Sequence, residues 1–202
     1  MSTSDHSSGP GRPREFEIDA AVESAMQVFW TRGYHGTSLV DLIDGTGLSR
    51  GSLYKAFGDK HGLFLDALDR YIAQSLERLL GTLQQPGSAK AAIRKTLMGL
   101  AEMSCRAEGR RGCLLVATAT EMVSHDELVA DRVKAMIDRI RKAYAEAIRR
   151  GQASGEIAAH HDPQTLATLI VCFTHGMRTL GKVDAIDKQM RAVVDQAMRL
   201  LD

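Results

Sequence analysis

A short segment of the chain, SRGSLYKAFGDK from Ser49 to Lys60, gathers side chains that can recognise a nucleic acid. Arginine can donate two hydrogen bonds to guanine O6 and N7, and serine can donate to a base or a phosphate. Short side chains let a helix approach the floor of the major groove closely. The candidate recognition residues are Ser49, Arg50, Gly51, Ser52, Tyr54 and Lys55.

Two side chains of this region are suited to the phosphate backbone. Tyr54 offers a hydroxyl on a stiff ring, and Lys60 stands at the expected start of the next helix, where its charge and the free backbone donors both favour an anion. The wider charge balance does not favour DNA, because residues 1–70 hold 7 Lys and Arg against 10 Asp and Glu, a formal charge of −3. A purely structural helix pair is therefore the alternative.

A helix-turn-helix would position these residues. The expected helices cover 41–45 and 49–57, joined by a turn through Gly47. Leu53, Ala56 and Phe57 are expected on the inner face, against Phe29, Leu42 and Leu48.

The remaining pattern is helical, and no alternating run indicates a strand. Ser38, Ser49, Asp59 and Asp162 are expected N-caps, and Asp184 is expected to start the last helix. Further helices are predicted at 19–34, 59–79, 89–107, 113–124, 126–151, 163–181 and 184–201. The fold class is all-α, with about nine helices.

Composition leaves the partners open, because the net charge of the 202 residues is only +1. Three cysteines without CxxC spacing indicate neither a disulfide framework nor a zinc site, and reduced thiols in the cytoplasm are expected. No run is long enough to cross a membrane. The cluster at 160–162 lacks metal-ligand spacing, and no catalytic or cofactor motif is present, so we expect no metal, no cofactor and no enzymatic activity.

The segment RGYHGTSLVDLIDGTGLSRGSLYKAFGDKHGLF closely resembles the DNA-binding domain of the TetR family of transcriptional repressors. The resemblance implies a homodimer that binds a palindromic double-stranded operator, with residues 49–55 on the bases and Thr37, Tyr54 and Lys60 on phosphate. Ser38 joins Thr37 among the candidate DNA-binding residues. The positions that match the family pattern are Gly33, Thr37, Ser38, Gly47, Leu48, Ser49, Gly51, Ser52, Leu53, Tyr54, Phe57, Lys60 and Leu63.

Ile43 and Gly45 depart from the family pattern, and both are expected to affect packing between the second and third helices. Upstream, residues 1–15 have the composition of a flexible arm. Within it, Arg12 and Arg14 flank a proline and are suited to an extended minor-groove hook, although a solvated tail is the equal alternative. The expected domains are this arm, a helix-turn-helix domain at 16–62 and a regulatory domain at 63–202.

The regulatory domain is expected to bind an unknown small-molecule inducer and to form the dimer. The last two predicted helices carry broad apolar faces that can pair with those of a second subunit as a four-helix bundle. The expected interface residues are Leu166, Leu169, Ile170, Phe173, Met177, Met190, Val193, Val194 and Ala197.

Cys113 is a candidate sensor thiol. The segment RGCLL at 111–115 is similar to a segment of TetR regulators that respond to electrophiles, in which a cysteine at the equivalent position can react. A helix N-terminus and two preceding arginines would favour the thiolate, and Cys105 is close enough in sequence to form a disulfide with an oxidised Cys113. The alternatives are an apolar ligand bound in the helical core and a cysteine that only fills space. Cys172 is expected in the core.

The sequence thus predicts a dimeric TetR-type repressor that leaves its operator when a ligand binds or a thiol is modified. The alternative is a helical binding or enzymatic protein in which the helix-turn-helix is only structural.

Overall fold

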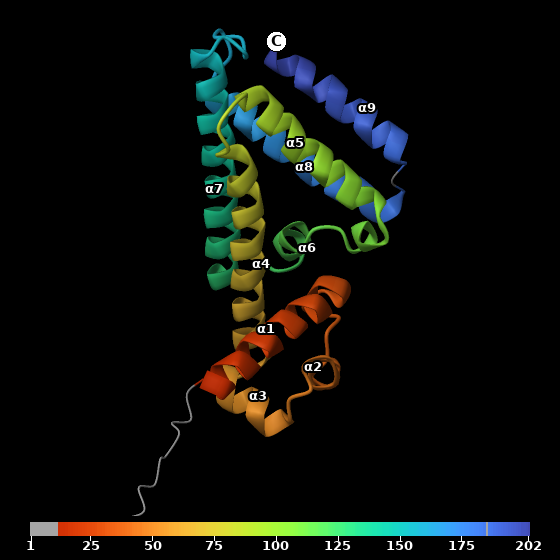
Figure 1. Ribbon diagram of the computed structural model, residues 1–202. Coiled ribbons are helices and arrows are strands. Elements are labelled where there is room, and N and C mark those ends of the chain that lie inside the picture. The colour runs from red at the N-terminus through yellow and green to blue at the C-terminus, as the bar shows by residue number, and fades with distance from the viewer. Residues whose placement is uncertain (1–11, 185) are drawn as a thin grey trace, which may run out of the picture. The chain divides into compact units, whose positions relative to one another are not determined.

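The computed structural model describes residues 12–184 and 186–202, except for the side chains of 12–16 and 108. Within these residues the chain is all-α, as predicted, and contains no strand (Figure 1). The helices are α1 (Arg12–Arg32), α2 (Leu39–Thr46), α3 (Arg50–Phe57), α4 (Lys60–Leu83), α5 (Ala89–Cys105), η1 (Ala107–Arg111), α6 (Leu114–Glu121), α7 (Glu127–Ala153), α8 (Pro163–Val183), α9 (Asp187–Met198) and η2 (Arg199–Leu201).

The chain divides into two compact units. The first ends at Arg70 and the second covers Tyr71–Asp202, so the long helix α4 contributes to both. Among the described residues, no helix is long and apolar enough to cross a membrane.

The first unit packs α1 to α3 and the start of α4 around a small apolar core. The rings of Phe29 and Phe64 meet edge to face, with centroids 5.0 Å apart, and Leu42 and Leu53 are fully buried. The expected inner face of α3 is confirmed at Leu53. Ala56 is exposed, because an eight-residue helix buries only a narrow stripe and Ala56 lies at its edge.

The first helix begins earlier than its apolar pattern indicated. It starts at Arg12 rather than Asp19, which corrects the expected arm at residues 12–15. A proline near a helix start costs no hydrogen bond, and the residues that follow it include good helix formers such as Arg14 and Glu15. The rest of the expected arm, residues 1–11, lies outside the described residues.

The predicted caps of four helices are confirmed. Ser38 accepts a hydrogen bond from the Asp41 N–H and donates its own N–H to the Asp41 carboxylate, a complete capping box for α2. Ser49 and Asp59 accept from backbone N–H groups at the starts of α3 and α4, and Asp162 does so for α8.

The expected start of the last helix at Asp184 is wrong. Asp184 has an extended backbone and ends α8, while α9 starts at Asp187. Acidic residues stand at both 184 and 187, so the preference for acidic residues at a helix start does not identify the first one.

The second unit is a helical bundle in which α5 and α8 lie side by side (Figure 1). Gly181 on α8 allows this closeness, because a Cβ there would lie 2.7 Å from the Ser104 Cβ on α5. Tyr144, Ile93 and Leu97 are among its buried core residues.

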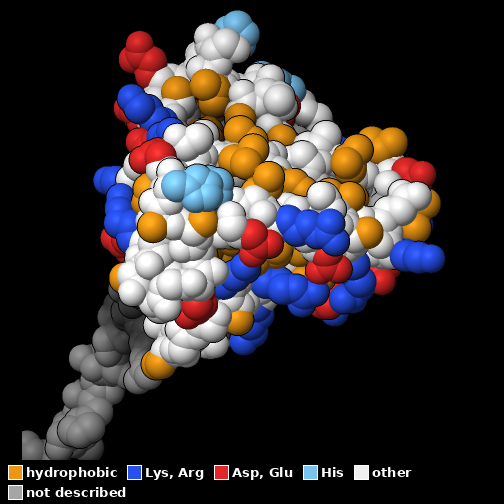
Figure 2. Space-filling view, turned by 90° about the horizontal axis from the view of Figure 1, so that it is seen from above, with side chains coloured by type: hydrophobic (Ala, Val, Ile, Leu, Met, Phe, Trp, Pro, Cys, Tyr) orange, Lys and Arg blue, Asp and Glu red, His pale blue; other side chains and the backbone are white. Residues whose placement is uncertain are grey.

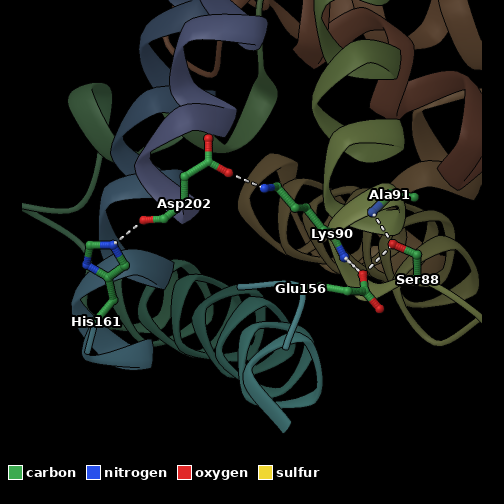
Figure 3. A network of polar contacts seen from close by, with 6 residues as sticks. All are labelled: Ser88, Lys90, Ala91, Glu156, His161 and Asp202. Carbon is green, nitrogen blue, oxygen red and sulfur yellow. Dashed lines mark hydrogen bonds and ion pairs between the residues drawn. The ribbon is translucent and has the colours of Figure 1, made fainter. Parts of the chain in front are cut away.

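A polar network connects the end of the chain to the start of α5 (Figure 3). Glu156 accepts hydrogen bonds from the Ser88 hydroxyl and the Lys90 N–H, and Lys90 forms an ion pair with Asp202. His161 Nε2 lies 3.3 Å from the Asp202 carbonyl oxygen. The hydrogen bond from the Ser88 hydroxyl, and after it that from the Lys90 N–H, lowers the pKa of Glu156, so its carboxylate stays charged in this network.

Candidate nucleic-acid interface

A tight turn presents α3 to solvent. Gly47 ends α2 with a φ of 71°, a left-handed conformation that glycine adopts at little cost. Two residues later, the Ser49 hydroxyl accepts the Ser52 N–H at 3.2 Å and starts α3. Leu53 then anchors the helix in the core. The turn and these local contacts fix which face of α3 remains outside.

The outer face of α3 carries the predicted recognition residues, and the structure brings them together. All are exposed, and a Cβ on Gly51 would have no neighbour within 4 Å. The exposed residues are Ser49, Arg50, Gly51, Ser52, Tyr54 and Lys55. The helix therefore offers hydrogen-bond donors on a surface whose first turn carries only small residues beside Arg50, as entry into a major groove requires.

Two cationic side chains of the first unit, Arg50 and Lys60, lie over aromatic rings. The Arg50 guanidinium lies 5.7 Å from the centroid of the Tyr54 ring. The Lys60 ammonium lies 4.4 Å from the Tyr34 ring, which itself packs edge-on against Phe64. Because a cation over an aromatic face loses side-chain freedom before binding, less entropy remains to be lost when a phosphate or base is contacted.

Thr37 and Ser38 differ in their access to a phosphate. Ser38 is exposed, whereas Thr37 is only 2% exposed and donates its hydroxyl proton to the Gly33 carbonyl at 2.6 Å. This placement corrects the expectation that the Thr37 side chain contacts phosphate, because its single donor is used to close the end of α1.

The proposed arm residues do not lie in the extended backbone that the sequence suggested for a minor-groove hook. Arg12 and Arg14 lie in the first turn of α1, where the backbone is helical. Their side chains lie outside the described part of the structure.

Gly45 contacts a different helix from the one expected. A Cβ on Gly45 would lie 2.5 Å from Val28 Cγ2, so this residue sets the distance between α2 and α1 rather than between α2 and α3. Sequence reasoning also missed the ion pair between Arg32 and Asp41, 3.1 Å apart, which joins the end of α1 to the start of α2.

The candidate sensor thiol lies in the second unit. Cys113 is the N-cap of α6, as expected, and its sulfur lies 3.2 Å from the Tyr71 hydroxyl oxygen. Cys105 is the last residue of α5, and partial burial raises the pKa of its thiol, which opposes the thiolate form. Cys172 is exposed on α8, which corrects its expected place in the core.

The predicted dimer residues fall into two groups. Leu166, Ile170, Met177, Met190 and Val194 are buried within the chain's own core. Leu169 and Val193 are 45% and 47% exposed, and Phe173 and Ala197 are half-buried. Only this second group is available to another subunit.

Known proteins resemble the chain across both units. Residues 21–67 match the family described as "Bacterial regulatory proteins, tetR family", and residues 89–197 match "Tetracyclin repressor-like, C-terminal domain". The HTH-type transcriptional repressor ComR of Escherichia coli is 29% identical over 191 residues, covering 94% of this chain and 91% of that protein. The HTH-type regulator YezE of Bacillus subtilis is also 29% identical, with 95% and 100% covered.

A solved structure adds a DNA complex. A cysteine mutant of the TetR family regulator CifR, complexed with 26bp double-strand operator DNA, is 34% identical and superposes with a TM-score of 0.83, covering 95% of this chain and 100% of that one. The named relatives are transcriptional regulators rather than enzymes. With both family domains matched across its two units, the chain belongs to the TetR family of DNA-binding transcriptional regulators.

Proposed function

We propose that the chain is a cytoplasmic homodimeric repressor that binds a palindromic operator with α3 of each subunit. The observation that carries this proposal is the outer face of α3, where Arg50 and Lys55 are exposed and a Cβ on Gly51 would have no neighbour within 4 Å. Arg50 reads a guanine, while Ser49 and Ser52 donate to bases or phosphate. Tyr54 and Lys60 hold the phosphate backbone, and Ser38 adds a donor at the start of α2.

The dimer is proposed to form through α8 and α9. Leu169 on α8 and Val193 on α9 are large apolar side chains exposed in the single chain, and burying them against a second copy would remove that surface from water. Apolar side chains also form a band between charged ones on the face seen in Figure 2. In a two-fold dimer the spacing of the recognition helices determines which operator half-sites can be bound together.

Release from the operator is proposed to start in the regulatory unit, at residues 63–202. One route is a small-molecule inducer. A small apolar pocket between α5, α8 and α9 is lined by Leu97, Leu169 and Phe173 among others. Since Leu169 and Phe173 also belong to the proposed dimer surface, an apolar ligand bound there would act directly on the contact between subunits. The second route is modification of Cys113. Either event would favour a conformation whose recognition helices no longer fit successive major grooves.

A binding titration tests the proposal. The full chain is titrated against a fluorescent duplex taken from the DNA upstream of its own gene, with a duplex of the same composition in shuffled order as the control. We expect saturable binding to the first duplex that weakens steeply with salt, and weaker binding to the second. Equal affinity for both duplexes would favour the alternative, a helical binding or enzymatic protein whose helix-turn-helix is only structural.

A further inference from the structure

A buried group of polar side chains surrounds Cys113, and the DNA-binding surface does not use it. The hydroxyl of Tyr71, a buried residue of α4, lies 3.2 Å from the Cys113 sulfur. Arg178 on α8 is 5% exposed, and it donates to the Gly112 carbonyl, next to Cys113, and to the Ser104 hydroxyl at 3.2 Å. A thiol, a phenol and a guanidinium from distant parts of the sequence therefore meet in the second unit.

Arg178 places an uncompensated positive charge in this group. A guanidinium stays protonated in proteins, and both of its hydrogen-bond acceptors here are neutral. The ion pairs among the described residues do not include Arg178. Because a buried charge without an opposite charge is costly, a nearby negative charge would stabilise the folded unit. The thiolate of Cys113 can supply it.

Tyr71 and Cys113 form a pair in which either group could lose a proton. A thiol ordinarily ionises at lower pH than a phenol, and burial raises the pKa of Tyr71 further. Tyr71 therefore keeps its proton and can donate it in a hydrogen bond to an ionised sulfur. A hydrogen bond to the charged form favours that form.

The backbone and the other charges around the thiol act in the same direction. Cys113 is the N-cap residue of α6, so it stands at the positive end of the helix dipole, although its sulfur accepts no capping hydrogen bond. Lys182 on α8 lies beside Gly112, and Arg110 and Arg111 precede Cys113 in sequence. These neighbours are cationic, and Tyr71, whose hydroxyl contacts the sulfur, stays neutral.

We propose that Tyr71 and Arg178 are positioning residues that hold Cys113 as a reactive thiolate for attack on small electrophiles. This inference rests on the proposed thiol-sensing role of the regulatory unit. The thiol proton passes to solvent when Cys113 ionises. The sulfur lone pair then forms a bond to the electrophilic carbon, and the leaving group departs with the electrons of its former bond. The product is a neutral thioether.

The same geometry gives modification a structural consequence. Alkylation removes the negative charge and leaves Arg178 without an opposite charge. Because Arg178 joins α8 to Ser104 on α5 and to Gly112 before α6, the packing of these three segments is weakened in the modified protein.

Alkylation kinetics test the proposal. The full chain reacts with iodoacetamide over a series of pH values, and peptide mass spectrometry reads each cysteine separately. We expect Tyr71→Phe to slow the alkylation of Cys113 at neutral pH by about tenfold and to move the midpoint of its pH profile upward, because a hydrogen bond to a charged sulfur is lost. Reduced glutathione added to the same reaction serves as the reference thiol.

Tyr144→Phe is the matched control. Tyr144 is also buried, and its hydroxyl contacts Thr96 rather than a thiol. This variant should leave the Cys113 profile unchanged. A Tyr71→Phe profile identical to that of Tyr144→Phe would overturn the proposal.

Arg178 gives an independent reading if Tyr71→Phe folds poorly by circular dichroism. Arg178→Lys keeps the charge and should retain most of the reactivity, whereas Arg178→Gln should raise the midpoint. Equal profiles for these two variants would contradict a role for the charge.

Operator release by the alkylated protein is measured separately by fluorescence anisotropy. If Cys113 reacts equally fast in the wild type and in Tyr71→Phe, this inference is refuted. If Cys113 reacts more slowly in Tyr71→Phe but the alkylated wild type stays on the operator, this inference is supported and only the sensing role is refuted.

Discussion

Gly45 of α2 lies directly against Val28 of α1, so closely that a Cβ atom on Gly45 would lie 2.5 Å from Val28 Cγ2. Non-bonded carbon atoms do not approach to this distance without displacement. The glycine therefore allows α2 to pack on α1, and this packing fixes the position from which α3 leaves the turn.

We expect Gly45→Ala to lower the free energy of unfolding by about 1–3 kcal/mol, because the added methyl group overpacks this contact. Urea unfolding followed by circular dichroism measures it. Gly51→Ala is the matched control, since Gly51 is also helical but has open space around it, and it should stabilise the protein by about 0.5–1 kcal/mol. Equal destabilisation by both substitutions would refute the packing role of Gly45.

The capping box of α2 makes a pH-dependent contribution to stability. Hydrogen bonds from Ser38 lower the pKa of Asp41, with a smaller effect from Arg32. A lowered pKa stabilises the fold above the unfolded value of about 3.9, and this stabilisation disappears as pH falls through the folded pKa. Asp41→Asn should therefore be less stable than the wild type at neutral pH and equally stable in acid, as read by urea unfolding at each pH.

Ser38→Ala removes the other half of the same box and should cost about 1 kcal/mol at neutral pH. A difference between Asp41→Asn and wild type that persists unchanged into strong acid would show that the carboxylate charge is not responsible.

The dimer prediction depends on apolar side chains that the single chain leaves exposed. Leu169→Glu should shift the protein from dimer to monomer in sedimentation velocity, because a carboxylate would have to be buried at the interface. Leu128→Glu is the control, as Leu128 is 55% exposed on α7, away from the proposed interface. A dimer that survives Leu169→Glu as well as Leu128→Glu would place the interface elsewhere.

Local features of the fold could be predicted from sequence because they depend on residues a few positions apart. The caps at Ser38, Ser49 and Asp59 each act on a backbone group three residues away, so the sequence shows both partners. The exposed face of α3 could likewise be predicted, because the spacing of apolar and polar residues around Tyr54 follows the turn of a single short helix.

Contacts between distant residues could not be predicted in this way. Burial of Thr37, the packing of Gly45 on Val28 and the exposure of Cys172 each depend on how helices pack, which no local pattern encodes. Tyr71 and Cys113 are 42 residues apart, and only the folded second unit brings them together.

The most direct test of DNA recognition by α3 and Lys60 is a binding titration of Arg50→Ala and Lys60→Ala. Each variant is titrated with the operator and with operators that carry single base-pair changes. Arg139→Ala on α7 is the control. Arg50→Ala should cost about 1–3 kcal/mol on the operator and relax the preference at one base pair. Lys60→Ala should weaken binding to all duplexes alike and reduce the salt dependence by about one counterion. Operator affinity and base preference that stay at the Arg139→Ala values in both variants would contradict the assignment of α3 and Lys60 to DNA.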